Sequence, residues 1–285
     1  MKIEKGQCAV VTGAASGIGL ALCEAFTAAG LNVVMADIEA PRLEQAAAGL
    51  ANAEGKAKYK VCDVRKADQL DALAAFAESE FGAVHILCNN AGVFVGGAAW
   101  ENTAADYQGG FDVNVAGIAN GLRAFVPKMI AHGEPAHIVN TASMAALTTM
   151  PFSSVYCMSK AAALHLNECC YKELQVSAPH ISVSVLCPEL VDTDISKAGR
   201  NRPQELSAPG DLIETEFSKM PLQAITESTA TGVSPALMAE KVMKGIAEDR
   251  FYLLADDFWH DIAMARLEDI RAGDNPRMVF GDDAA

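Results

Sequence analysis

The sequence contains few aromatic residues and few prolines, and it lacks any long apolar run. Aromatic side chains make up 6% of the 285 residues, and the 22 glycines and 11 prolines are too few for a collagen-like or low-complexity chain. No window of about 18 uncharged apolar residues is present, which argues against a transmembrane helix and a membrane partner. The first residues lack the apolar stretch and cleavage site of a secretory signal, so we expect a cytoplasmic protein.

Basic residues are also scarce. The chain has 22 Lys and Arg against 36 Asp and Glu, giving a formal charge of −14 with histidine neutral. Because nucleic acids and anionic membranes carry negative phosphates, this balance argues against binding to either. The chain is 51% hydrophobic and 20% charged, which is typical of a globular protein with a large core. We therefore predict one domain over residues 1–285.

Metal-binding patterns are missing as well. The eight cysteines form no CxxC pair and most lie in apolar segments, so we expect reduced, buried thiols rather than disulfides. No zinc signature is present, and Asp192 and Asp194 are expected to be solvated or capping. We predict no metal site. The histidines expected to be structural are His85, His137, His165 and His180.

Short apolar runs alternate with longer helical patterns along the chain. The predicted strands cover residues 8–11, 32–36, 58–61, 85–88, 137–141, 181–186 and 251–254. Strands separated by helices require right-handed crossovers and give a parallel sheet with helices on both faces. The predicted fold class is therefore α/β: a Rossmann-type, doubly wound parallel sheet of seven strands in a three-layer αβα arrangement.

Two segments interrupt this alternation. Residues 189–233, here called the lid segment, are too long for an ordinary connection and too apolar for a linker. They form either a lid over a ligand site or an ordered surface excursion. The C-terminal extension, about residues 256–285, begins with helical periodicity over 256–271 and serves either as a partner of the lid or as a subunit contact.

A glycine-rich turn lies between the first predicted strand and the first predicted helix. Glycines allow a tight turn, a close approach of backbone N–H groups to a pyrophosphate, and close packing of helix on strand. The positive end of the helix then favours the phosphate charge. In this position the turn favours dinucleotide binding over a purely structural role. Its predicted cofactor contacts are Gly13, Ser16, Gly17, Ile18 and Gly19.

An acidic residue ends the second predicted strand. Asp37 lies 18 residues after Gly19, close to the roughly 20 expected for an acid that binds the adenosine ribose, although it could instead cap the helix that starts near Pro41. Its charge would repel a 2′-phosphate, and Ile38 follows it rather than a basic residue. We therefore expect NAD rather than NADP. Arg42 is the nearest cation that could compensate.

A possible acid–base pair lies in a later helical segment. Tyr156 and Lys160 are four residues apart and so share a helix face. A free phenol has a pKa of about 10, too high for a base at neutral pH, and a nearby ammonium and a positive nicotinamide would favour the phenolate. Ser143, just past the fifth predicted strand, is placed to hydrogen-bond a substrate oxygen.

In combination these motifs resemble the short-chain dehydrogenase/reductase family over about residues 5–255. The resemblance implies Tyr156 as acid and base, Ser143 orienting the substrate oxygen, and Lys160 holding the nicotinamide ribose and lowering the tyrosine pKa. It implies strand order 3-2-1-4-5-6-7 and a homotetramer or homodimer. The motifs that carry it are Thr12 with the glycine turn, Asp63, Asn89, Asn90, Ala91, Gly92, Asn114, Ser143, Tyr156, Lys160, and Pro188 to Thr193.

The resemblance also assigns further site residues. Asn114 would anchor a water in the proton relay, although it could instead bridge backbone groups in a helix bend. The expected cofactor contacts beyond the glycine turn are Asp37, Ile38, Asp63 and Val64 near adenosine, Asn90, Ala91 and Gly92 along the cofactor, Tyr156, Lys160 and Pro188, and Val191 and Thr193 at the carboxamide.

The chain departs from the family where Pro188 is followed by Glu189 instead of glycine. The Glu189 side chain points into the substrate cleft or faces solvent. We expect substrate contacts from Ser143, Ala145, Tyr156 and Glu189. A basic cluster of Lys197, Arg200 and Arg202 leaves an anionic substrate open. The expected apolar wall comprises Phe94, Val95, Ala145, Met150, Phe152, Leu190, Leu206, Leu212, Phe217 and Met220.

Three functions are consistent with these observations. The leading hypothesis is hydride transfer between NAD(H) and a bulky, mainly apolar secondary alcohol or its ketone. An acyl-chain or steroid reductase of the same family is the second. A nucleotide-sensing protein without turnover is the third, and the set of Asn114, Ser143, Tyr156 and Lys160 argues against it.

Overall fold

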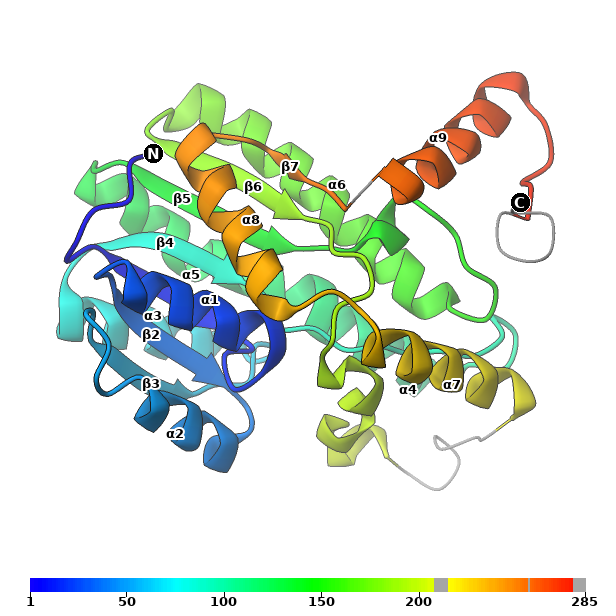
Figure 1. The fold of residues 1–285 in the computed structure, drawn as a ribbon, viewed down its shortest axis with the longest axis horizontal. Helices are drawn as coiled ribbons and strands as arrows, with labels where there is room; N and C mark the ends of the chain where they lie inside the picture. The colour runs from blue at the N-terminus through cyan, green and yellow to red at the C-terminus, as the bar shows by residue number, and fades with distance from the viewer. Residues whose placement is uncertain (208–214, 256, 279–285) are drawn as a thin grey trace.

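Seven strands form one sheet in the computed structural model, which describes residues 1–207, 215–255 and 257–278 (Figure 1). All strand pairs are parallel and the order is β3-β2-β1-β4-β5-β6-β7, as predicted. The last strand is shorter than expected. The strands are β1 (Cys8–Thr12), β2 (Asn32–Asp37), β3 (Ala57–Val61), β4 (Val84–Asn89), β5 (Ala136–Thr141), β6 (Ile181–Leu186) and β7 (Tyr252–Leu253).

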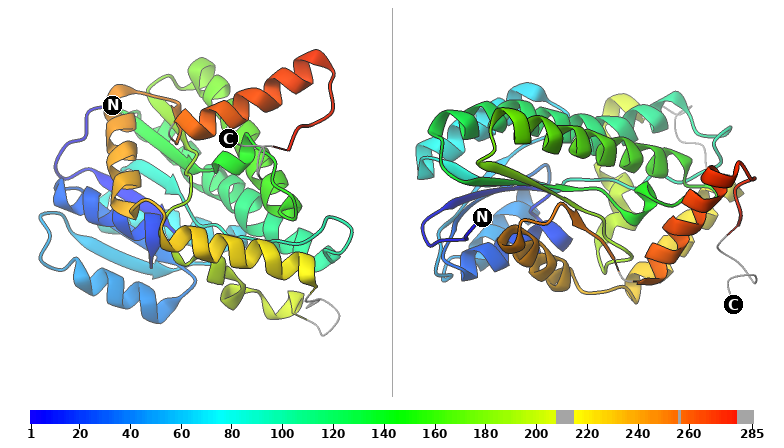
Figure 2. Two further views of the ribbon diagram at one scale, coloured as in Figure 1. Left: turned by 45° about the vertical axis from the view of Figure 1, so that its right-hand side comes forward. Right: turned by 90° about the horizontal axis from the view of Figure 1, so that it is seen from above.

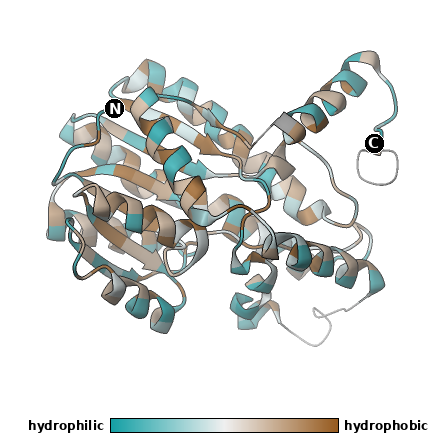
Figure 3. Ribbon diagram, viewed as in Figure 1, coloured by the Kyte–Doolittle hydropathy of each residue, from teal (hydrophilic) through white to brown (hydrophobic). Residues whose placement is uncertain are grey.

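The inner strands are apolar on both faces because both faces are covered. In β1, Ala9 and Val11 belong to the core cluster on one face, and Cys8 and Val10 belong to the cluster on the other. All five β1 residues are buried. Figure 3 shows this concentration of hydrophobic residues in the strands. Two-sided burial explains why these strands appear in the sequence as continuous apolar runs.

Helices cover both faces of the sheet, and the views in Figure 2 separate the two layers. Proline at the first turn of α2 and of α8 suits a helix start, and α5 ends at Gly133 in the left-handed conformation. One layer contains α1 (Gly17–Ala28), α2 (Ala40–Gly49) and α8 (Pro235–Glu248); the other contains α3 (Ala67–Phe81), α4 (Ala104–Phe111), α5 (Gly117–His132) and α6 (Ser154–Ser177).

The lid segment is largely helical where the structure describes it. It contains the 3₁₀ helices η3 (Asp194–Asn201) and η4 (Gln204–Leu206) and the α-helix α7 (Glu216–Ala230). Leu212 lies outside the described residues. The predicted helix in the C-terminal extension is confirmed as α9 (Asp257–Ala272), which projects beside the sheet in Figure 1. None of the described helices has the length and apolar content needed to cross a bilayer.

All eight cysteines are free thiols, as expected, and seven are buried. Cys169 is the exception and is exposed. The expected structural role of His137 fits its position inside β5, where it is buried and its Nε2 lies 2.7 Å from the Ser184 hydroxyl. Burial lowers the pKa of His137 to about 4, so the imidazole is neutral at pH 7.

Candidate active site

The glycine turn joins β1 to α1 and requires glycine for two separate reasons. Gly13 and Gly17 have φ of 67° and 52°, in the left-handed region that side chains disfavour. Gly19 has no such φ, but a Cβ atom there would lie 2.0 Å from the Gly13 carbonyl oxygen. Ser16 is the extended N-cap of α1, and its side chain makes no capping hydrogen bond. The first turn of α1 is therefore held close to the turn with its N-terminus uncapped by a side chain.

Asp37 is the last residue of β2, and its carboxylate accepts hydrogen bonds from two backbone segments. Its Oδ2 accepts a 3.0 Å hydrogen bond from the Ala15 N–H in the glycine turn, and its Oδ1 accepts one of 3.0 Å from the Glu39 N–H. The N-cap of α2 is Glu39, so Asp37 orders the entry to this helix without being its cap. The carboxylate also lines the cleft described below, which is consistent with the expected ribose-binding position.

The loops after β3 and β4 contribute to the same edge of the sheet. The Asp63 carboxylate is paired with Arg65, whose Nη2 lies 2.7 Å from Oδ2, and both residues border the cleft. Asn90 joins three strand ends: its N–H donates to the Thr12 hydroxyl at 3.0 Å, and its Oδ1 accepts from the Thr141 hydroxyl at 3.2 Å. Arg65 was missed, although its position two residues after Asp63 was a usable signal.

The acid–base candidates lie together on α6 and the loop after β5. Lys160 and Tyr156 are both buried, and the Lys160 Nζ lies 5.8 Å from the centroid of the tyrosine ring. Nζ also donates a 3.1 Å hydrogen bond to the Thr141 carbonyl at the end of β5. The Ser143 side chain hydrogen-bonds the phenol of Tyr156 and accepts a 3.1 Å hydrogen bond from the Ala145 N–H. The three predicted side chains therefore meet at one point.

Burial shifts the pKa values of Tyr156 and Lys160 in opposite directions, and each shift favours the neutral form of the side chain. It raises the pKa of Tyr156 to about 12, against a smaller lowering by the Ser143 hydrogen bond. It also lowers the pKa of Lys160 to about 8. Lys160 was expected to lower the tyrosine pKa; in the protein alone the net shift is upward because burial dominates, and the effect of Lys160 remains a prediction. The physical reason is that loss of water around a buried phenolate outweighs the attraction of a cation several ångströms away.

Asn114 lies behind the cleft instead of in its wall. It sits in a π-helical turn, η1 (Asp112–Ala116), where such irregular turns often mark functional sites. Its side chain accepts a 2.9 Å hydrogen bond from the Val93 N–H and donates to the Val93 carbonyl at 3.0 Å and the Ser159 hydroxyl at 2.9 Å. These contacts match the bridging alternative; a role in holding water remains a prediction.

A single cleft at the carboxyl ends of the strands connects all these groups. It runs between β1 and β4, where the strand order reverses, which is the position at which such sheets bind ligands. Every residue predicted to contact cofactor lines it except Gly19, which is buried behind Gly13. The lining includes the predicted residues Gly13, Ser16, Gly17, Ile18, Asp37, Ile38, Asp63, Val64, Asn90, Ala91, Gly92, Ser143, Ala145, Tyr156, Lys160, Pro188, Glu189, Val191 and Thr193.

The apolar wall at the other end differs from the predicted one. Ala145, Met150 and Leu190 line the cleft as expected. The prediction is wrong for Phe94, Val95, Phe152, Leu206, Phe217 and Met220, which are not part of the described lining. Aromatic packing explains part of the difference: Phe94 contacts Tyr156 from behind at 5.1 Å, and Phe152 stacks on Phe217 at 4.7 Å between ring centroids.

Later segments of the chain supply side chains that sequence reasoning missed. Ile195 comes from η3, Ile225 and Thr229 from α7, and Trp259 from α9. The helical periodicity of these segments gave no signal for which face would meet the cleft. Residues of α7 and α9 both line the cleft, which favours the lid interpretation over a surface excursion; the lid role of both helices remains a prediction.

Glu189 lines the cleft and is partly buried, which decides between its two expected positions. Among the described residues, the only non-glycine residues with positive φ are Phe152 and Asp249. Glu189 therefore occupies this loop without the strained backbone that would require the family's glycine. The Pro188 carbonyl accepts a 3.0 Å hydrogen bond from the Met144 N–H, which fixes the loop against the strand end that carries Ser143.

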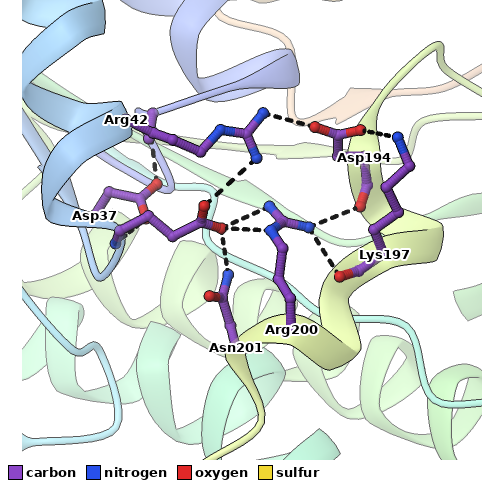
Figure 4. A network of polar contacts seen from close by, with 8 residues as sticks. Asp37, Arg42, Asp194, Lys197, Arg200 and Asn201 are labelled. Carbon is purple, nitrogen blue, oxygen red and sulfur yellow. Dashed lines mark hydrogen bonds and ion pairs between the residues drawn. The ribbon is translucent and has the colours of Figure 1, made fainter.

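The three cations of the predicted basic cluster are all engaged in ion pairs. Lys197 lies 2.9 Å from Asp194, Arg200 lies 2.6 Å from Glu39, and Arg202 pairs with Asp106 at 2.5 Å. Arg42, the cation expected to compensate Asp37, lies 2.6 Å from Asp194 (Figure 4). These pairs do not favour the anionic-substrate alternative. Asp194 was expected to be solvated or capping; the two cations lower its pKa to about 2.

The fold and cleft define a doubly wound α/β protein with a ligand site at the switch point of its sheet. A model of the short chain dehydrogenase family matches residues 7–204. The chain is 34% identical over 270 residues to 1-deoxy-11-beta-hydroxypentalenate dehydrogenase of Streptomyces exfoliatus, covering 90% of each chain. It is 33% identical over 255 residues to C alpha-dehydrogenase of a Sphingobium species, covering 89% of this chain and 82% of the relative.

A solved structure agrees with these sequence relatives. A short-chain dehydrogenase/reductase from Burkholderia phymatum in complex with NAD is 36% identical, superposes with a TM-score of 0.95, and matches 99% of this chain and all of that one. The chain therefore belongs to the short-chain dehydrogenase family of oxidoreductases.

Proposed function

We propose that this protein transfers hydride between NAD(H) and a bulky, mainly apolar secondary alcohol or the matching ketone. The single observation that carries the proposal is the convergence, in one cleft, of the glycine turn and Asp37 at one end and Ser143, Tyr156 and Lys160 further along. The relative that was solved with NAD and the relatives named as dehydrogenases support it.

The cleft fits a dinucleotide. Gly13 and Gly17 leave the backbone of the turn open, and no side chain caps the N-terminus of α1. A pyrophosphate bound there would accept hydrogen bonds from these backbone N–H groups. Asp37 lines the adenosine end. Its negative charge favours a ribose hydroxyl over a 2′-phosphate, so NAD is the proposed cofactor.

The protein's own groups handle the proton. NAD, when bound, supplies the hydride acceptor. In alcohol oxidation the Tyr156 phenolate takes the hydroxyl proton and Ser143 holds the substrate oxygen. The neutral phenol, whose pKa burial raises to about 12, is suited to donate a proton to a ketone in the reverse direction. Lys160 contributes positive charge below its pKa of about 8, which favours the phenolate form.

The substrate end favours an apolar compound. Met144, Met150, Ile195, Ile225 and Trp259 surround it, and the nearby cations are ion-paired. Ser143 and Glu189 line the cleft, and we expect both to contact the substrate. We expect a homotetramer or homodimer and a cytoplasmic location; both remain predictions.

The test is NADH formation by the purified protein with a graded panel of secondary alcohols, followed by absorbance. Turnover should rise with apolar size of the alcohol and should be at least about tenfold more efficient with NAD than with NADP. Equal efficiency with NADP, or binding of NADH without turnover of any alcohol or ketone in the panel, would contradict the proposal. The second result would favour a nucleotide-sensing protein.

A further inference from the structure

A carboxylate two residues after Asp37 holds two guanidinium groups at the adenosine end of the cleft. Glu39 lines the cleft and is the N-cap of α2. Its Oε1 lies 2.6 Å from Nη2 of Arg200 and accepts a 2.8 Å hydrogen bond from Nε of the same side chain. Its Oε2 lies 3.4 Å from Nη1 of Arg42, and Asn201 Nδ2 donates to Oε1 at 2.5 Å. Figure 4 shows Arg42, Arg200 and Asn201 in one network of polar contacts.

Arg200 uses all three of its nitrogens in these contacts. Besides the contacts of Nε and Nη2 with Oε1 of Glu39, Nη1 donates to the carbonyls of Lys197 at 2.9 Å and Asp194 at 3.3 Å. Arg200 itself lines the cleft, whereas Arg42 does not. The adenosine end therefore contains a guanidinium that is present but already committed to Glu39.

We propose that Glu39 is a specificity-determining residue that excludes NADP by keeping Arg200 occupied. An arginine fork is the side chain best suited to bind a phosphate in two places. Neutralised by Glu39, Arg200 cannot supply that charge, and the Glu39 carboxylate adds to the repulsion from Asp37. The exclusion of a 2′-phosphate would then depend on two acids and one sequestered arginine. This inference rests on the proposed function, since it concerns the choice between its two coenzymes.

The same contacts also fasten the lid segment, because Arg200 and Asn201 belong to η3. A variant at position 39 could therefore act only by loosening the lid. Glu205 offers a matched comparison: it lies in η4 of the lid segment, and its Oε1 lies 3.1 Å from Nη1 of Arg65. Removing its charge weakens a lid contact but leaves Arg65 bound to Asp63 at 2.7 Å, so no guanidinium is released.

The experiment compares Glu39→Gln with Glu205→Gln in the full-length protein. The dissociation constants of NADH and NADPH are measured by fluorescence titration at fixed ionic strength. We expect Glu39→Gln to tighten NADPH binding at least about tenfold, change NADH binding less than about threefold, and make NADPH binding more sensitive to salt. Glu205→Gln should leave the ratio of the two constants unchanged. Adding Arg200→Ala to Glu39→Gln should remove most of the gain, because only the part due to the lost Glu39 charge is then left.

Two outcomes would overturn the inference. Equal weakening of both coenzymes by Glu39→Gln would assign Glu39 to lid closure alone. A gain for NADPH that persists in full in the double variant would show that removal of negative charge, and not release of Arg200, is responsible. Failure of the wild-type protein to bind NADH at all is a different result, because it would refute the proposed function before the variants are compared.

Discussion

The two ends of the cleft are built in different ways. The adenosine end is made mainly from the short turns that directly follow β1, β2, β3 and β4, with Arg200 of η3 beside them, so most contributing residues lie within a few positions of a strand end. The substrate end takes Ile195, Ile225 and Trp259 from η3, α7 and α9, which come late in the chain. The family match over 7–204 includes the first end and stops before α7 and α9.

The difference teaches where chemistry and specificity reside. Strand ends in a sheet buried on both faces place a backbone turn reproducibly, because moving it would disturb the core. Added helices can change without disturbing that core. We therefore propose that cofactor binding and proton transfer depend on the sheet edge, and that substrate choice depends on the lid segment and the C-terminal extension. Variants that affect one end should leave the other unchanged.

The largest effect on catalysis is expected from the hydroxyl of Tyr156, which lies between the two ends of the cleft. Tyr156→Phe should lower kcat/KM for alcohol oxidation by about 10³ or more, about 4 kcal/mol, since it removes the only hydroxyl of this side chain and with it the proposed base. The dissociation constant of NADH should stay within about twofold. Tyr59→Phe, at an exposed position on β3, is the matched control. Loss of NADH binding in Tyr156→Phe would show that the two ends are not separable.

A backbone change at the adenosine end should have the next largest effect. A Cβ atom at Gly19 would lie 2.0 Å from the Gly13 carbonyl oxygen, so Gly19→Ala must displace the turn. We expect NADH binding to weaken about 100-fold, as measured by titration, with a loss of stability of about 2 kcal/mol. Gly49→Ala is the control, because a Cβ atom there has nothing within 4 Å and the residue ends a helix. Unchanged NADH binding in Gly19→Ala would contradict the assigned role of the turn.

Both ends of the cleft depend on the stability of the sheet, and that stability is expected to fall at acid pH. Burial lowers the pKa of His137 from 6.5 to about 4, so the unfolded chain binds a proton more readily between these values. Its contribution to stability is complete above pH 6.5 and is lost as the pH falls toward 4. The free energy of unfolding in urea should fall by about 2 kcal/mol from this group between pH 7 and pH 4.5.

The control for this prediction uses two histidine variants. His137→Gln should reduce the pH dependence of unfolding, whereas His165→Gln, at an exposed position, should retain it. NADH binding and turnover should decline together as the sheet loses stability. An identical pH dependence in His137→Gln and the wild type would refute the assignment.

The smallest effect sharpens the comparison at the substrate end. Trp259→Ala should raise KM for a bulky apolar alcohol about tenfold and leave KM for a small alcohol and the dissociation constant of NADH unchanged, because it removes apolar area from the wall of the cleft. Steady-state kinetics with the alcohol panel provides the measurement. Trp100→Ala, at a highly exposed position, is the matched control. An equal rise in KM for small alcohols would place Trp259 in general packing of the extension.

Several parts of the site could be predicted from the sequence because each is a local property of a short segment. The turn at Gly13 to Gly19, the acid at Asp37 and the helical spacing of Tyr156 and Lys160 all depend on residues within one turn or one helix. Once the strand order was expected, their meeting at the strand ends followed. The expected apolar wall failed where the direction of a side chain depended on partners distant in the chain. Phe152 and Phe217 face each other instead of the cleft.

The sequence by itself therefore determined the parallel sheet and the positions of the turn, the acid and the proposed catalytic side chains, because apolar periodicity and short motifs are encoded locally, whereas the strand order followed from the resemblance to the family. Only the tertiary structure decided that Glu39 holds Arg200 from 161 residues away, that Trp259 reaches the cleft, and that burial raises the pKa of Tyr156. These depend on partners distant in the chain and on exclusion of water, and both arise only when the elements pack.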